Sequence, residues 1–132
     1  MLLQRAKKIN GFTLTEMMVV VALIAVLASM AMSSYQSSYT KTRRAAAQQF
    51  MMQISNKEEQ YFLDARGYTT VLGTGGLVLS IPEEVSPYYT VVITTTTTPP
   101  AFTITATPQE VQTADGVLVL NSDGSKTPVE KW

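Results

Sequence analysis

Residues 8–21, KINGFTLTEMMVVV, decide the fold of this 132-residue chain because a long apolar helix begins within them. No residue from Met17 to Thr40 is charged, and residues 17–32 are almost entirely Met, Val, Ala, Leu and Ile. A helix over the uncharged segment would measure about 36 Å, against about 30 Å for the hydrocarbon core of a bilayer. The stretch therefore predicts a membrane-spanning helix with one acidic residue, Glu16, at the edge of its apolar part.

The helical pattern continues well beyond the apolar segment. Neither Gly nor Pro occurs between Phe12 and Arg66, so no residue there interrupts a helix. After Arg44, apolar side chains recur at spacings of three, four and seven, as in a one-faced helix: Ala47, Phe50, Met51, Ile54, Tyr61 and Phe62. We expect one continuous helix that stops near Gly67, a residue suited to a left-handed cap.

The rest of the chain has the pattern of strands. Thr, Val, Tyr and Pro become frequent after Gly67, and residues 88–93 and 102–107 have a period of two, in which Tyr89, Val91 and Ile93, and likewise Phe102, Ile104 and Ala106, share one face. Pro99 and Pro100 predict a hairpin tip, and residues 122–125 predict a turn after a third strand. The predicted fold class is α+β: a long N-terminal helix, hydrophobic in its first half, packs by its C-terminal half on a small antiparallel sheet of three or four strands.

Composition argues against enzymatic chemistry. The ten basic and ten acidic residues cancel, and the chain contains neither Cys nor His. Disulfides, thiol chemistry and the commonest acid–base catalyst and metal ligand are therefore excluded. No phosphate-binding loop, nucleophile triad or metal-ligand spacing occurs either. We expect no catalytic residue, no metal and no cofactor.

A removable signal peptide is an alternative interpretation of the N-terminus. Six of the ten basic residues lie in the first 44 positions, and Ser29-Met30-Ala31 has the small-x-small form of a signal cleavage site. Against this alternative, the polar residues 13–16 separate the basic residues from the apolar run. A signal peptide normally passes straight from one to the other, so we prefer a retained helix.

The N-terminal motif resembles that of type IV pilins. The matching residues are Gly11, Phe12, Thr13, Leu14 and Glu16, followed by the apolar run. The resemblance implies that a prepilin peptidase cleaves between Gly11 and Phe12 and methylates the new amine of Phe12. It also implies that Glu16 pairs with this amine on a neighbouring subunit. The implied organisation is a leader peptide (1–11), a hydrophobic transmembrane and fibre-core helix (12–44) and a globular head (45–132).

Motifs in the head resemble those of PilE-like minor pilins; they lie at residues 61–64, 66–69, 88–91, 102–108, 116–121 and 124–127. This resemblance implies a structural, minor subunit of a type IV pilus that supports pilus biogenesis, twitching motility or adhesion. The implied partners are other pilin subunits, the prepilin peptidase, the inner-membrane assembly machinery and, before assembly, the lipid bilayer. The implied location is a single pass through the inner membrane, followed by the extracellular fibre.

The chain departs from this pattern in two places. Members of the group usually carry a cysteine pair, whose places here align with Asp115 and Lys131. We expect these two residues to form a surface ion pair instead of the disulfide. Ser33 stands about where major pilins commonly have a proline that interrupts the helix.

Two other functions remain open. One is a membrane-anchored binding protein whose head carries DNA uptake or adhesion, although the sequence offers no positive support for DNA as a partner. The other is a pseudopilin of a type II secretion system, which would share the N-terminal motif.

Some residue groups have a plain and a functional interpretation. Residues 94–98, a run of Thr, suit a solvated sheet edge or an adhesive or glycosylated patch. The pairs Glu58-Glu59 and Glu83-Glu84 suit solvated charge or paired catalytic carboxylates. In both cases we favour the plain interpretation.

Three basic residues follow the apolar segment: Lys41, Arg43 and Arg44. They suit contacts with DNA or anionic lipid. We favour a role as markers of the lipid boundary, where they later meet acidic heads of neighbouring subunits.

Overall fold

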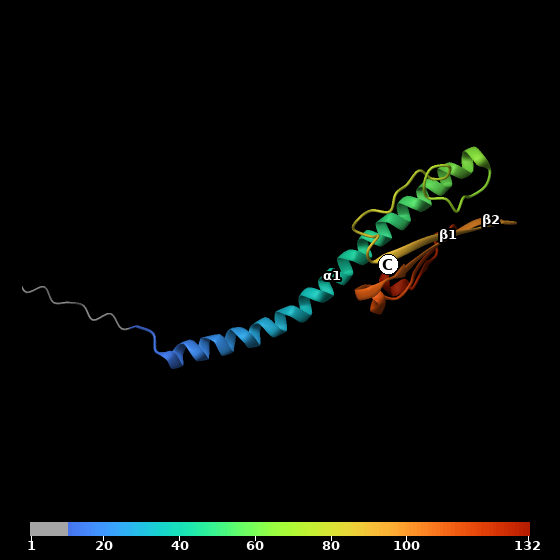
Figure 1. The fold of residues 1–132 in the computed structure, drawn as a ribbon. Coiled ribbons are helices and arrows are strands. Elements are labelled where there is room, and N and C mark those ends of the chain that lie inside the picture. The colour runs from blue at the N-terminus through green and yellow to red at the C-terminus, as the bar shows by residue number, and fades with distance from the viewer. Residues whose placement is uncertain (1–10) are drawn as a thin grey trace, which may run out of the picture. The chain divides into compact units, whose positions relative to one another are not determined.

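The structure is a computed structural model that describes residues 11–132, without the side chains of residues 33 and 34. Except for Gly11, the predicted leader lies outside the described residues. The elements are α1 (Leu14–Ala65), β1 (Tyr89–Thr97), β2 (Pro100–Pro108), η1 (Glu110–Asp115), β3 (Leu118–Asn121), β4 (Lys126–Thr127) and η2 (Val129–Lys131) (Figure 1). The chain forms two units, which divide within α1 between Ser37 and Ser38.

Helix α1 confirms the predicted continuous helix. It ends at Ala65, and the backbone N–H of Arg66 still donates to the Phe62 carbonyl at 2.9 Å. The predicted cap residue was wrong. Arg66, with φ of 53°, takes the left-handed conformation in place of Gly67. The helix therefore ends at Ala65, two residues before the glycine that the sequence pattern favoured.

The four strands form one antiparallel sheet in the order β1-β2-β3-β4, so each strand pairs with the next along the chain. Strand β1 pairs with β2 from Tyr89 opposite Pro108 to Thr97 opposite Pro100, which confirms the predicted hairpin tip. The threonine run belongs mostly to β1, whose last residues are exposed. As β1 is an edge strand, the favoured interpretation of this run, a solvated sheet edge, agrees with the structure.

The core lies between one face of the sheet and the second half of α1. Burial alternates along β1 and β2, as expected where one sheet face is covered and the other meets water. The helix contributes Phe50, Met51 and Ile54, each at most 2% exposed. The sheet contributes residues such as Val91, Ile93, Phe102, Ile104, Ala106, Leu118 and Leu120. This packing confirms the predicted α+β class.

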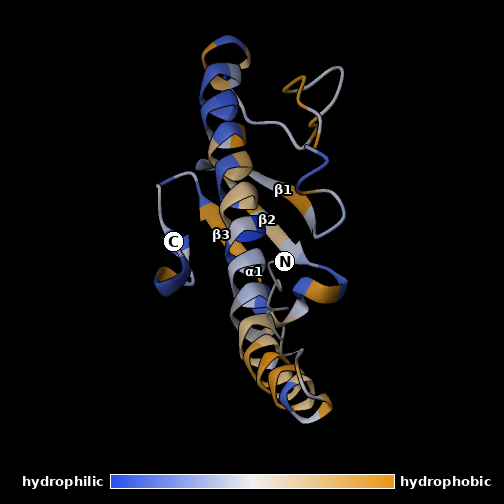
Figure 2. Ribbon diagram, turned by 90° about the vertical axis from the view of Figure 1, so that its left-hand side faces the viewer, coloured by the Kyte–Doolittle hydropathy of each residue, from blue (hydrophilic) through white to orange (hydrophobic). Residues whose placement is uncertain are grey.

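The first half of α1 differs from the second half, because its own residues are apolar on all sides of the helix (Figure 2). Its Met, Val, Leu and Ile side chains between Met17 and Met32 are 42–70% exposed. Among the described residues, α1 is the one helix long and apolar enough to cross a membrane. Large exposed apolar surfaces mark contacts with a membrane or with other proteins, so this segment requires a partner outside the chain.

Candidate functional site

The residues around the predicted cleavage point lie in an exposed segment before α1. Gly11 and Phe12 have no regular secondary structure, and Phe12 is 80% exposed. A Cβ atom added at Gly11 would meet no other described atom within 4 Å. The fold therefore imposes no steric requirement for glycine there.

Glu16 is held by a capping interaction at the start of α1. Its Oε2 accepts hydrogen bonds from the backbone N–H of Thr13 at 2.8 Å and from the Thr13 hydroxyl at 2.7 Å. The backbone N–H of Glu16 in turn approaches the Thr13 hydroxyl oxygen at 3.3 Å. This reciprocal arrangement is a capping box, which satisfies free N–H groups of the first helical turn. The sequence analysis missed this role of Thr13, although Thr-x-x-Glu before an apolar run is its signature.

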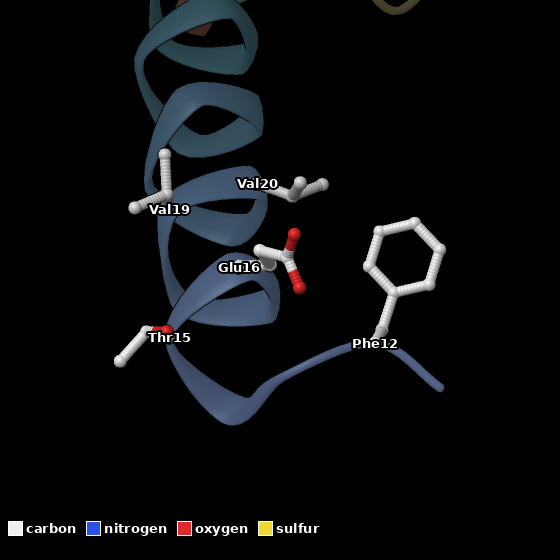
Figure 3. Close-up of a pocket in the computed structure, with 5 residues that line it drawn as sticks. All are labelled: Phe12, Thr15, Glu16, Val19 and Val20. Carbon is white, nitrogen blue, oxygen red and sulfur yellow. The ribbon is translucent and has the colours of Figure 1, made fainter. Parts of the chain in front are cut away.

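Phe12 and Glu16 line the same shallow groove, which has a volume of about 340 Å³. Figure 3 shows the Glu16 carboxylate on the same side of the helix as Val20 and pointing toward the ring of Phe12. Thr15 and Val19 complete the lining. The structure thus brings together the residue predicted to carry the new amine and the predicted acidic contact. Whether Glu16 contacts another subunit stays a prediction.

A second polar cluster lies inside the head, around Asp115. The guanidinium of Arg44 forms a two-pronged ion pair with the Asp115 carboxylate, with Nε to Oδ2 at 2.8 Å. The hydroxyl of Tyr89 donates to the same Oδ2 at 2.6 Å, and the amide of Gln112 donates to the Tyr89 oxygen at 3.1 Å. The Asp115 side chain is only 1% exposed. Charge-assisted, two-pronged pairs of this kind are among the stronger polar contacts in proteins.

This cluster corrects the hypothesis about Asp115 and Lys131. The two residues do meet, but the ammonium of Lys131 donates to the backbone carbonyl of Asp115. The Asp115 carboxylate pairs with Arg44, and it is buried instead of lying on the surface. The proposed surface ion pair was therefore wrong in both its partner and its location.

Electrostatics within the cluster follow from burial and pairing. Burial alone would raise the pKa of Asp115, but hydrogen bonds from Arg44 and Tyr89 outweigh it and hold the pKa below its ordinary value. Burial, together with the bond to Asp115, raises the pKa of the Tyr89 hydroxyl above its usual value. Asp115 is therefore ionised and Tyr89 neutral at physiological pH.

The structure also corrects the interpretation of Glu58 as a solvated charge. Glu58 is fully buried, and its Oε2 accepts the backbone N–H of Thr69 at 3.1 Å. Its Oε1 has no hydrogen-bond partner among the described residues. Burial raises the pKa of Glu58, the Thr69 N–H opposes the rise, and the charge of Glu59 adds to it. Glu83 and Glu84 are exposed, as expected.

The three basic residues after the apolar segment have different environments. Arg44 is used inside the head, so its predicted role toward neighbouring subunits was wrong. The guanidinium carbon of Arg43 lies 3.9 Å from the ring centroid of Tyr88, a cation–π contact. Lys41 is exposed and has neither a hydrogen bond nor an ion pair within the described part of the chain. Of the three, only Arg44 forms an ion pair among the described residues, and Lys41 has no contact with a ring either.

No group of His, Cys, Asp or Glu suited to a metal ion occurs among residues 11–132. The polar clusters around Asp115 and Glu58 join structural elements of the fold.

Comparisons with known proteins agree with both halves of the chain. Residues 33–116 match the family described as type IV minor pilin ComP, DNA uptake sequence receptor, and residues 6–32 match the prokaryotic N-terminal methylation motif. A solved type IV pilin from Shewanella oneidensis is 25% identical, with a TM-score of 0.55; the match covers 68% of this chain and 92% of that one. The predicted fold is thereby confirmed. No curated protein matched.

Proposed function

We propose a route of processing and assembly for this chain, which belongs to the family described as type IV minor pilin ComP, DNA uptake sequence receptor. The match covers more than half of the chain, and the solved pilin shares its fold. The chain is therefore a minor pilin subunit of a type IV pilus, a structural role that involves other pilins and the pilus machinery. The resemblance to type IV minor pilins is confirmed.

The first step is removal of residues 1–11 by a prepilin peptidase, which cuts between Gly11 and Phe12 and methylates the new amine. The methylation motif supports this step, and so does the exposure of the residues on either side of the cut. Since the fold does not require glycine at position 11, a requirement for it would come from the peptidase. An extended, unobstructed backbone is what a protease needs around the bond it cleaves.

The second step is anchoring and assembly through residues 12–44, with residues 45–132 as the head. The exposed apolar side chains of this helix would first contact inner-membrane lipid in a single pass, and later the equivalent helices in the fibre. Glu16 would then pair with the methylated amine of Phe12 from a neighbouring subunit. A charge that enters an apolar fibre core without a partner is costly, so this pairing would set the axial register. The single observation that carries the proposal is the acidic side chain beside Phe12 at the start of an uncovered apolar helix.

Intact mass of the membrane-extracted protein tests the processing step. We expect a chain that begins at Phe12 and carries one added methyl group. A full-length chain, or a cut near Ala31, would contradict the proposal.

Incorporation into sheared fibres tests the assembly step. Glu16→Ala should leave cleavage intact and lower the amount of subunit in fibres, because the amine would lose its partner. Thr15→Ala is the matched control, since Thr15 lines the same groove but carries no charge. Normal incorporation of Glu16→Ala would remove Glu16 from the mechanism.

A second candidate function is reception of DNA by the head. It is favoured by the family description, whose matched residues lie mostly in the unit Ser38–Trp132. This unit carries seven Lys and Arg against nine Asp and Glu, so attraction to DNA would depend on local cations. Arg43 is one candidate, because it is partly exposed and its guanidinium lies over the ring of Tyr88 and forms no ion pair among the described residues.

Binding of duplex DNA by the processed chain, residues 12–132 in detergent, tests this function. We expect affinity to fall steeply as salt rises, because phosphate contacts release counterions. Arg43→Gln should weaken binding and reduce the salt slope, whereas Lys57→Gln serves as a control at an exposed lysine elsewhere on α1. Absence of binding to any duplex, including fragments of the native genome, would contradict a receptor role.

A further inference from the structure

The short helix η1 lies beside α1 at the point where the apolar segment of α1 ends. The side-chain amide of Gln112 in η1 donates to the backbone carbonyl of Thr40 at 3.0 Å. Thr40 is the last residue before the first charged one, Lys41. Both η1 and Thr40 belong to the unit Ser38–Trp132, so this contact fixes η1 at one level along the helix.

The length of the apolar segment places this level among the lipid headgroups. Residues 17–40 form about 36 Å of helix, whereas the hydrocarbon core is about 30 Å thick and the bilayer with its headgroups about 40–45 Å. When Met17 lies at one edge of the hydrocarbon, Thr40 lies about 6 Å beyond the other edge. A helix tilt of about 20° shortens the span by only about 2 Å. Helix η1 is therefore at the depth of the headgroups.

The residues around the start of η1 are of the kinds found at membrane interfaces. Val111, which precedes Gln112, is 70% exposed. The backbone N–H of Gln109 donates to the Tyr88 carbonyl at 2.8 Å, and the Tyr88 ring centroid lies 3.9 Å from the guanidinium carbon of Arg43. An aliphatic, an aromatic and a cationic side chain therefore surround the start of η1, as in the interfacial belts of membrane proteins.

The charges at this level favour an anionic surface. Helix η1 and the adjacent residues 41–44 of α1 carry three basic residues against two acidic ones. Arg44 and Asp115 neutralise each other as an ion pair. Lys41 and Arg43 then remain against Glu110, and the balance is positive. Phosphates of anionic phospholipid match this balance at the depth where η1 lies.

We propose that η1 is a second membrane contact of the unassembled subunit, in which Val111 enters the headgroup region and Arg43 binds phosphates of anionic phospholipid. The inference rests on the proposed anchoring through residues 12–44. Attachment by both α1 and η1 limits the directions in which the head can tilt over the bilayer. The lipid contact ends when the subunit leaves the membrane, so it precedes any contact of Arg43 with DNA in the fibre.

Depth-dependent fluorescence quenching in vesicles tests the proposal, because the chain has no Cys and a single one can be labelled. The processed chain is reconstituted in phosphatidylcholine and phosphatidylglycerol that carry a nitroxide on the headgroup or deep in the acyl chain. The label on Val111→Cys should be quenched more by the headgroup nitroxide than by the deep one. Leu63→Cys, which is 80% exposed and about 35 Å farther along α1 than Thr40, is the control and should be quenched by neither.

A label on Thr113→Cys separates contact with the membrane from proximity to it. Thr113 is an exposed residue of η1, so its label reports how closely η1 approaches the lipid. Adding Val111→Asn should reduce the quenching of this label, because a polar side chain gains less from the apolar part of the interface. Val129→Asn is the matched control, since it changes a similarly exposed valine in η2 and should leave the quenching unchanged.

The electrostatic part is tested with the same label. Arg43→Gln should lower the ratio of heads in contact with lipid to heads lifted off about fivefold, which corresponds to about 1 kcal/mol per basic residue near an anionic surface. Lys57→Gln, farther along α1, should not change this ratio, and Arg43→Gln should have no effect in vesicles of phosphatidylcholine alone. If neither Val111→Asn nor Arg43→Gln changes the quenching, η1 lies near the membrane without contacting it, and the proposal is overturned.

A label in the apolar segment distinguishes failure of this inference from failure of the proposed anchoring. Leu27 is 67% exposed and lies about 15 Å along the helix from Met17, close to the middle of the hydrocarbon. If the label on Leu27→Cys is quenched by the deep nitroxide but the label on Val111→Cys is quenched by neither lipid, the contact of η1 is wrong and the anchoring stands. If the label on Leu27→Cys is not quenched either, the anchoring itself is contradicted, and the contact of η1 falls with it.

Discussion

Replacing Asp115 by Asn tests whether the Arg44–Asp115 pair stabilises the head as a buried contact or only as a surface contact. The Asp115 side chain is 1% exposed and that of Arg44 21%. Removing one charge of a buried pair typically costs about 3–5 kcal/mol, against at most about 1 kcal/mol for an exposed pair. Since Arg44 keeps some contact with water, we expect a loss near the lower limit, about 3 kcal/mol.

The loss should be measurable in both chemical and thermal unfolding. For a domain of this size, about 3 kcal/mol corresponds to a fall in Tm of roughly 12–24 °C. Urea unfolding of the processed chain in detergent can be followed by fluorescence, because Trp132 is the single tryptophan and packs against the core. Asp123→Asn, at an exposed aspartate, is the control; an asparagine oxygen can still accept the hydrogen bond from the Ser125 backbone N–H, so stability should change by no more than about 0.5 kcal/mol.

A double-mutant cycle completes the test. Arg44→Gln combined with Asp115→Asn should cost less than the sum of the two single changes, because either substitution already breaks the pair. If Asp115→Asn costs less than about 1 kcal/mol, or if the two losses simply add, the buried pair does not hold the head together.

Further predictions concern the neighbours of this cluster and Glu58. Glu58→Gln should raise Tm at pH 7, because burial raises the pKa of Glu58 and its ionised form therefore destabilises the folded state. The gain should disappear in thermal scans below about pH 4, where Glu58 is protonated in the folded and the unfolded chain. An equal gain at all pH values would contradict this cause. Tyr89→Phe should cost about 1–2 kcal/mol in urea unfolding and shift acid unfolding to higher pH, because a depressed Asp115 pKa contributes stability that is lost as pH falls through it. Changing both Asp115 and Lys131 to Cys should give a crosslink visible by gel mobility, yet a less stable head than wild type, because Arg44 loses its partner. A more stable crosslinked head would contradict that reasoning.

The main elements were predictable because local periodicity determines them. The spacing of Phe50 and Ile54 predicted the buried face of α1, and alternation around Val91 and Ile104 predicted two strands. Their pairing followed from the turn residues between them. The left-handed conformation of Arg66 was not predictable, because glycine is the usual residue in that conformation and Gly67 stands next to it.

The buried charges are not determined by local periodicity. Arg44 and Asp115 lie 71 residues apart, and no local pattern indicates that a polar residue after β2 faces the helix. Glu58 could have been predicted. It lies four residues after Ile54, on the buried face of α1, so its position predicts burial although glutamate is usually exposed.

The contacts of Asp115 and Lys131 suggest how a head without cysteines fastens its C-terminal segment. By resemblance, these two positions correspond to a disulfide, yet here each is attached to α1. Arg44 holds the Asp115 carboxylate, and Gln48, one turn later, donates to the Lys131 carbonyl at 2.7 Å. A disulfide stabilises mainly by restricting the unfolded chain, typically by about 2–4 kcal/mol, whereas these contacts act only in the folded state. Unfolding of the C-terminal segment should therefore be coupled to loss of the helix contact, and the stability of the head should not depend on the redox state of its surroundings.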